Sequence, residues 1–231
     1  MKIRFFIIIA LAAILCLQGC ETPRDEIVPV SIDELLSQVS ESEIYATASD
    51  LQGFVTRVVG YQGNVDAATY LHDRFAAMPG LSVAHQGGSM RNVVATLPGT
   101  DEASDKVYIV GAHYNSTSST PDLAPGATDN ACGVGIVLEL ARIMSKYRFK
   151  DTLKFAAWNA EEPGLYGSDA YVSEAELNNE NIELYVNYDS AGYDPEGRLI
   201  LDIMYNDNSS GGRRANESTQ WPLRTWLHNH I

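Results

Sequence analysis

The strongest chemical signal in the sequence is a pair of adjacent glutamates, Glu161 and Glu162, directly after an apolar run over residues 153–158. A carboxylate at the end of a buried strand is costly unless a partner compensates its charge. A metal ion with a coordinated water is such a partner, because one carboxylate can ligate the ion while the other accepts a proton from the water. The alternative interpretation is a solvated turn that carries two surface acids.

Three further residues with ligand chemistry follow or flank the predicted elements. His113 follows an apolar run over 107–112, Asp189 follows one over 184–188, and Asp129 closes a Gly/Pro-rich loop before a predicted helix. Because ligands in open α/β sheets bind at the carboxyl ends of the strands, we expect these side chains to converge on the two glutamates. One imidazole among several carboxylates suits zinc, with manganese or cobalt as alternatives.

Two asparagines are expected to support this site. Asn115, two residues after His113, is predicted to accept a hydrogen bond from the imidazole through its side-chain amide oxygen and so to fix the tautomer. Asp129 could instead serve as a helix N-cap, which is a common role for aspartate. Asn130 can fill that role, which would leave Asp129 free to bind a metal.

The elements that must position these residues alternate between helix and strand signals. Two capping boxes, Ser31-x-x-Glu34 and Ser40-x-x-Glu43, each open a helical stretch. Helical apolar spacing follows over 65–78, 133–147, 166–177 and 217–231, and strand-like runs occupy 81–86, 91–97, 106–112, 153–158, 184–188 and 199–204. This alternation predicts an α/β layer fold with a largely parallel central sheet.

Four ordered motifs resemble those of the M28 peptidase family of zinc aminopeptidases: GAHYNS at 111–116, PGATDNACGV at 125–134, EExGLxGS at 161–168 and NYD at 187–189. The resemblance covers about residues 51–204. It implies a three-layer αβα, zinc-exopeptidase-like fold with a mostly parallel, mixed central sheet and two Zn²⁺ ions in each complete domain. In that pattern His113, Glu162 and Asp189 are zinc ligands. Asp129 bridges the two ions, and Glu161 is the general base.

The sequence departs from this family pattern at two places. The family has aspartate where Asn115 stands, so His113 would be a less basic ligand. The last ligand of the family is a histidine far downstream of Asp189, which we expect beyond residue 231, so that the domain would lack its closing elements and one ligand. His228 and His230 are expected to be surface residues of the final helix.

These motifs lead to one main prediction of function and two alternatives. The resemblance implies a metal-dependent aminopeptidase that removes N-terminal residues from peptides through a zinc-activated water, with Glu161 as the base. The acidic residues near the metal would hold the free α-amine of the substrate. A glutaminyl-peptide cyclotransferase shares the fold and is compatible with GATD at 126–129. A catalytically inactive peptidase-like domain, which binds partners at a membrane surface, is the second alternative.

The N-terminal segment predicts export and lipidation. Residues 1–19, with a basic start and an apolar run over 5–17, are typical of a lipoprotein signal peptide. LQGC at 17–20 resembles a bacterial lipobox with Cys20 as the lipidated residue, residues 20–30 form a tether, and 31–231 form a zinc peptidase domain that is incomplete at its C-terminus. We therefore expect a protein of the bacterial cell envelope, anchored by lipid to the outer membrane or facing the periplasm.

Charge and cysteine content limit the other partners. The formal net charge of −14 disfavours nucleic acid and anionic lipid head groups, and it suits cations. Cys132 is the only cysteine outside the signal and lipidation segment, so no internal disulfide is expected. We expect a monomer that takes peptides with a free N-terminus as substrates.

Overall fold

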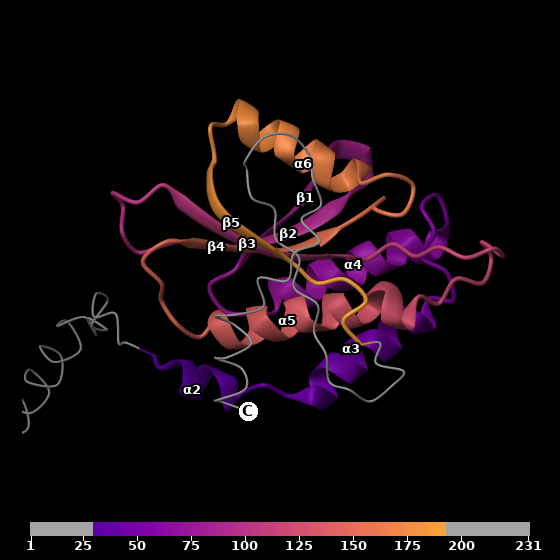
Figure 1. Cartoon of the computed structure of the whole chain (residues 1–231), viewed down its shortest axis with the longest axis horizontal. Helices are drawn as coiled ribbons and strands as arrows, with labels where there is room; N and C mark the ends of the chain where they lie inside the picture. The colour runs from indigo at the N-terminus through magenta and orange to yellow at the C-terminus, as the bar shows by residue number, and fades with distance from the viewer. Residues whose placement is uncertain (1–29, 193–231) are drawn as a thin grey trace, which may run out of the picture.

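Five strands and five α-helices form three layers in the part of the chain that the structure describes (Figure 1). The computed structural model describes residues 30–192. The predicted strand over 199–204, the predicted helix over 217–231 with His228 and His230, the signal segment and Cys20 lie outside these residues. Within residues 30–192, no helix is long and apolar enough to cross a membrane.

The central sheet contains β1 (Ser82–Gln86), β2 (Asn92–Leu97), β3 (Lys106–His113), β4 (Thr152–Trp158) and β5 (Asn181–Asn187), in the spatial order β1-β2-β4-β3-β5. Strand β3 pairs in parallel with both β4 and β5, whereas the β1–β2 and β2–β4 pairs are antiparallel. The predicted mixed sheet is confirmed. Its parallel part contains the three strands that lead into the predicted site residues.

Strand β5 begins earlier than predicted, at residue 181 rather than 184. The apolar pattern does not extend to this start because Asn181 and Glu183 are polar and exposed. Contacts near the start of β3 hold both residues: Asn181 Nδ2 donates to Asp105 Oδ1 at 2.8 Å, and Glu183 Oε2 lies 3.4 Å from Lys106 Nζ. Pairing with a neighbouring strand therefore extends β5 beyond its apolar run.

The helices lie on both faces of the sheet (Figure 1). They are α2 (Ile32–Leu36), α3 (Glu41–Gly53), α4 (Gln62–Ala76), α5 (Gly133–Met144) and α6 (Tyr166–Leu177). Helices α4 and α5 pack on one face, with α3 against α5, and α6 covers the opposite face. The result is the three-layer arrangement that the sequence predicts, with helix α5 directly beneath the strands that carry the site.

Both predicted capping boxes mark true helix starts. The side chain of Ser31 accepts a hydrogen bond from the backbone N–H of Glu34 at 3.1 Å, and Ser40 accepts one from Glu43 at 3.3 Å. Each bond satisfies an N–H group that would otherwise have no partner in the first turn of the helix.

The core consists of two apolar clusters, one on each face of the sheet. Successive strand residues point to opposite faces, so neighbouring residues of β2 and β4 enter different clusters. The cluster beneath α4 and α5 includes Leu71, Phe75, Val93, Ala95, Val134, Val137, Leu138 and Phe155. The cluster beneath α6 includes Val94, Ile109, Ala156, Trp158, Tyr171 and Ala175. A sheet packed on both faces holds its strand ends rigidly, and the site residues follow those ends.

Candidate metal centre

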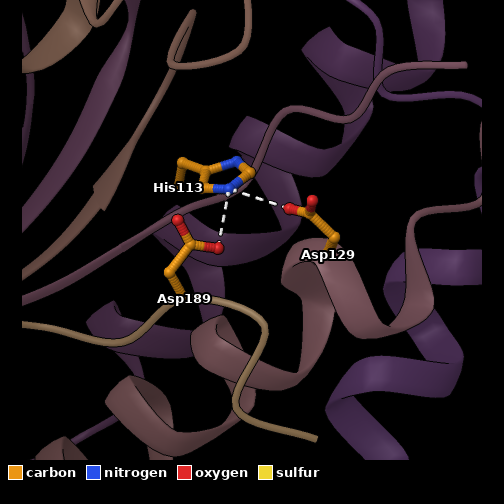
Figure 2. A group of neighbouring side chains, drawn as sticks. All are labelled: His113, Asp129 and Asp189. Atoms are coloured by element: carbon orange, nitrogen blue, oxygen red, sulfur yellow. Dashed lines mark ion pairs between the residues drawn. The ribbon is translucent and has the colours of Figure 1, made fainter. Parts of the chain in front are cut away.

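His113 is the centre of the site. It is the last residue of β3, and its side chain is only 2% exposed. Its Nδ1 lies 3.1 Å from the backbone carbonyl oxygen of Asn115, so that Nε2 faces the acidic residues. Nε2 lies 3.1 Å from Asp129 Oδ1 and 3.5 Å from Asp189 Oδ1, as Figure 2 shows. Glu161 Oε2 is 3.9 Å from the same nitrogen.

Asp129 reaches the site from a turn at the start of α5, and Asn130 organises that turn. The side-chain oxygen of Asn130 accepts a hydrogen bond at 3.1 Å from the backbone N–H of Gly133, the first residue of α5, although the N-cap position itself is Cys132 and not Asn130. Its Nδ2 donates to the carbonyl oxygen of Tyr188 at 2.8 Å. Asn130 therefore leaves Asp129 free and joins its turn to the residue before Asp189.

Asp189 is placed by the parallel register of β3 and β5. Gly111 of β3 pairs with Asn187 of β5, and Tyr188 N donates to the carbonyl oxygen of Gly111 at 2.9 Å. His113 and Asp189 each lie two residues beyond this pair, His113 as the last residue of β3 and Asp189 just after the end of β5. The convergence expected at the carboxyl ends of parallel strands is thus present.

Glu161 and Glu162 follow β4, whose last residue, Trp158, pairs with His113. The chain turns at Ala160, which has the left-handed φ of 53°. The carbonyl oxygen of Glu161 then accepts hydrogen bonds from the backbone N–H groups of Gly164 and Leu165, both at 2.8 Å. This closed turn presents both glutamate side chains towards the site instead of into bulk solvent, and both are half-buried.

The prediction that the side chain of Asn115 accepts a hydrogen bond from His113 is wrong. The imidazole of His113 contacts the backbone carbonyl oxygen of Asn115, not the amide oxygen of its side chain. That amide oxygen accepts a hydrogen bond from Glu161 N at 3.0 Å, since the buried side chain points across to the turn after β4. Among the described residues, Asn115 Nδ2 has no hydrogen-bond partner. Asn115 thus supports the glutamate turn.

The site concentrates negative charge, which a cation would compensate. Burial raises the pKa of Glu162, and the negative charge of Asp129 raises it further, while His113 opposes the shift. The ligand atoms of His113, Asp129 and Asp189 lie within 4.8 Å of one another, and those of His113, Glu161 and Glu162 form a second such group. An imidazole nitrogen with carboxylate oxygens is a donor set that fits zinc.

Sequence reasoning missed a set of buried asparagines behind the glutamate turn. Asn159, 2% exposed, accepts and donates hydrogen bonds with the amide of Asn64. Its backbone N–H donates to Asn92 Oδ1 at 3.0 Å, and its Nδ2 donates to Met90 O at 2.7 Å. The one available signal was the position of Asn159 at a strand end, two residues before Glu161.

Comparison with known proteins identifies the family of the chain. The sequence model of peptidase family M28 matches residues 92–229. A probable zinc metalloprotease of Pyrenophora teres f. teres is 32% identical over 190 residues, covering 70% of this chain and 41% of the relative. Leucine aminopeptidase 1 of Paracoccidioides brasiliensis is 27% identical over 181 residues, covering 70% of this chain and 46% of the relative. The chain thus spans less than half the length of these curated relatives.

Solved structures share the fold. The LapA aminopeptidase of Legionella pneumophila matches with a TM-score of 0.63 at 22% identity, covering 74% of this chain and 49% of that one. A glutaminyl cyclase of Bacteroides thetaiotaomicron matches with a TM-score of 0.54 at 19% identity, covering 67% of this chain and 63% of that one. The sheet, the motif order and the family model, which matches well over half of the residues, lead to one assignment: the chain belongs to peptidase family M28.

Proposed function

We propose that this protein is a zinc-dependent aminopeptidase that hydrolyses N-terminal residues from peptides. The observation that carries the proposal is the convergence of His113, Asp129 and Asp189 within ligand distance of one another, with Glu161 and Glu162 beside them. Family membership supports a peptidase, and the name of the fungal relative supports zinc.

In this proposal four residues hold zinc: His113, Asp129, Glu162 and Asp189. The metal would activate a water and polarise the carbonyl of the scissile bond, and a complete domain would hold two ions. Glu162 suits a ligand role because burial, together with the negative charge of Asp129, raises its pKa and so disfavours its ionised form until a cation is present. Asp129 belongs to the first ligand group, and its negative charge also acts on Glu162 of the second, which suits a bridging role.

Glu161 is the proposed general base. Its carboxylate reaches within 3.9 Å of His113 Nε2, and its backbone is held by Asn115 and by the closed turn. The carboxylate would accept a proton from the attacking water and then donate that proton to the leaving amine nitrogen. In this proposal the free α-amine of the peptide lies beside the acidic cluster, so that the scissile bond of the first residue is placed at the site.

A substitution at Glu161 tests this assignment. We expect Glu161→Gln to lower the kcat for a leucyl anilide by about 10²–10⁴-fold, because a positioned base contributes that much. Zinc content should stay unchanged, since Glu161 is not a proposed ligand. Glu174→Gln, an exposed change on α6, is the matched control and should leave both quantities unchanged. Unchanged hydrolysis by Glu161→Gln would exclude this residue as the base.

A glutaminyl cyclase is the second candidate, because one matching fold carries that activity. A cyclase would release ammonia from a peptide with N-terminal glutamine and leave a leucyl anilide intact. An aminopeptidase would do the reverse, so a comparison of the two substrates separates the candidates. A domain without activity would hydrolyse neither substrate and would hold no stoichiometric zinc.

We also propose that Cys20 carries a lipid anchor that holds the protein at the bacterial cell envelope. The support is the sequence of residues 1–20, which has the order of a lipoprotein signal. Cys20→Ala should move the protein from the membrane fraction to the soluble fraction of the envelope. A membrane fraction that keeps the variant would contradict the anchor.

A further inference from the structure

Arg57 has a buried, positively charged guanidinium group with no part in the proposed reaction. Its side chain is fully buried, and no carboxylate of residues 30–192 lies within ion-pair distance of it. Its guanidinium instead donates to four backbone carbonyl oxygens, those of Leu51, Tyr114, Pro125 and Gly126, at 2.6–2.9 Å. Burial lowers the pKa of Arg57 to about 10, and the negative charge of Asp129 opposes that shift.

Three of the four carbonyls that Arg57 binds lie at the two ends of one loop, and the fourth, that of Leu51, lies in α3. Tyr114 directly follows His113, and Gly126 stands three residues before Asp129. A planar, rigid guanidinium with several donors can hold such separate acceptors in one fixed geometry. Arg57 therefore closes the loop that connects two of the proposed metal ligands.

The backbone of the same loop is packed closely around the guanidinium. Ser116 Oγ accepts a hydrogen bond from Arg57 N at 3.0 Å and donates to the carbonyl oxygen of Ala124 at 2.7 Å. Gly126 has a left-handed φ of 49°, and a Cβ there would lie 3.0 Å from Arg57 Nη2 and 2.5 Å from Asp129 O. A side chain at position 126 would therefore displace either the guanidinium or the backbone at Asp129.

Stability alone is a weak reason for a buried charge. The cost of taking a charge out of water can exceed the attraction that the charge gains inside the protein. A guanidinium bound only to carbonyl oxygens therefore indicates a geometric role. The loop that Arg57 closes connects His113 with Asp129, whose side chains lie 3.1 Å apart.

The contacts of Arg57 also continue to the glutamate turn. The carbonyl oxygen of Arg57 accepts a hydrogen bond from Asn64 Nδ2 at 2.9 Å. Asn64 and Asn159 exchange hydrogen bonds through their side-chain amides at 2.9 and 3.0 Å. The side-chain oxygen of Asn159 then accepts one from Ala160 N at 2.9 Å, directly before Glu161. One buried chain of hydrogen bonds thus joins both parts of the site.

We propose that Arg57 is a positioning residue, which fixes Asp129 relative to His113 and, through Asn64 and Asn159, relative to the glutamate turn. The inference rests on the proposed metal site, and it adds a residue that contacts neither metal nor substrate. Removal of such an outer support lowers metal affinity, because the ligands must then be ordered at the moment of binding.

Zinc affinity and the cobalt spectrum test the proposal. We expect Arg57→Met to lower the affinity of the purified protein for Zn²⁺ by about 10–100-fold, the usual effect of removing an outer support. The absorption bands of bound Co²⁺ should change as well, because the ligand geometry changes. Arg57→Lys keeps the charge but lacks the planar fork, so we expect it to restore only part of the affinity.

Arg142→Met is the matched control. Arg142 lies in the last turn of α5 and makes comparable hydrogen bonds, but to Glu139 and to the carbonyl oxygen of Gln38, away from the site. We expect this variant to lose thermal stability while its zinc affinity and cobalt spectrum stay as in the wild type. A similar loss of zinc affinity in Arg142→Met would show a general effect of lost stability and would overturn the proposal.

Gly126→Ala is the second variant, for the case in which the Arg57 variants do not fold. The added methyl group would push against the guanidinium of Arg57 from the loop side, and Gly126 itself is only half-buried. This variant should therefore also lower zinc affinity. Folded Arg57 variants with wild-type zinc affinity and cobalt bands would overturn the proposal, and so would an unaffected Gly126→Ala variant. Wild-type protein that binds zinc but cleaves no peptide would contradict the proposed function alone. Wild-type protein that binds no zinc would contradict both.

Discussion

Replacement of Asp129 by asparagine should stabilise the metal-free protein and remove its stabilisation by zinc. The carboxylate oxygens of Asp129 and Asp189 lie within 4.8 Å of each other, and both are close to His113 Nε2. Two unit charges at that distance repel by about 1 kcal/mol in bulk water and by about 3.5 kcal/mol at an effective dielectric constant of about 20. The side chains are 55% and 46% exposed, so the lower part of that range applies.

The expected gain of the metal-free variant is therefore about 1 kcal/mol. Asparagine keeps a side-chain oxygen for the contact with His113 Nε2, and the attraction of Asp129 for the buried Arg57 is a smaller effect than burial, so its loss reduces the gain without reversing it. The assay is urea unfolding at neutral pH, with a chelator and with excess zinc. For the wild type, zinc at about 100 times its dissociation constant should add about 2.7 kcal/mol, which Asp129→Asn should largely lose.

Salt provides an internal check of this reasoning. High ionic strength screens the repulsion between partly exposed carboxylates, so the stabilising effect of Asp129→Asn in chelator should shrink towards zero at about 1 M salt. The reasoning fails if the variant is less stable than the wild type in chelator. It also fails if zinc stabilises both proteins equally.

Three other substitutions have defined outcomes. Asn115→Ala leaves the N–H of Glu161 without its acceptor and should cost about 1–3 kcal/mol in urea unfolding; a change near zero would contradict the contact. Burial raises the pKa of Glu139, but hydrogen bonds from Arg142 and from the backbone of Ser40 outweigh burial and lower the pKa overall. The ionised Glu139 therefore stabilises the fold above the pKa that this group has in the unfolded chain, and this stabilisation is lost as the pH falls through the pKa of the folded state. Glu139→Gln should thus lower the melting temperature at neutral pH and approach the wild type in acid, and a constant difference would refute this. Gly167→Ala places a Cβ against a backbone carbonyl and a buried amide and should cost about 3 kcal/mol in urea unfolding, whereas normal stability would contradict that packing.

The positions of the strand-end residues could be predicted because two regular features determine them. An apolar run marks where each buried strand ends, and parallel pairing brings the ends of neighbouring strands to one edge of the sheet. His113 and Asp189 follow from these features alone. The register of β3 and β5 places them beside each other as predicted, even though β5 starts three residues earlier than its apolar run.

The partners of the buried asparagines could not be predicted in this way. An asparagine can donate to or accept from almost any neighbour, so its partner depends on distances that only the folded chain sets. The side chain of Asn115 binds the glutamate turn, whereas only its backbone carbonyl oxygen contacts His113. The pairing of Asn64 with Asn159 joins residues 95 positions apart, and nothing in the local pattern of either segment indicates it.

Restoration of activity by zinc is the most direct test of the proposed metallo-aminopeptidase function. The purified protein would be stripped with a chelator and titrated with Zn²⁺, while bound zinc and hydrolysis of a leucyl anilide are measured in the same samples. We expect hydrolysis to vanish in the chelator and to return in proportion to stoichiometric zinc, and Glu161→Gln to bind zinc without recovering hydrolysis. Hydrolysis that persists without metal, or a protein that binds no stoichiometric zinc, would contradict the assignment.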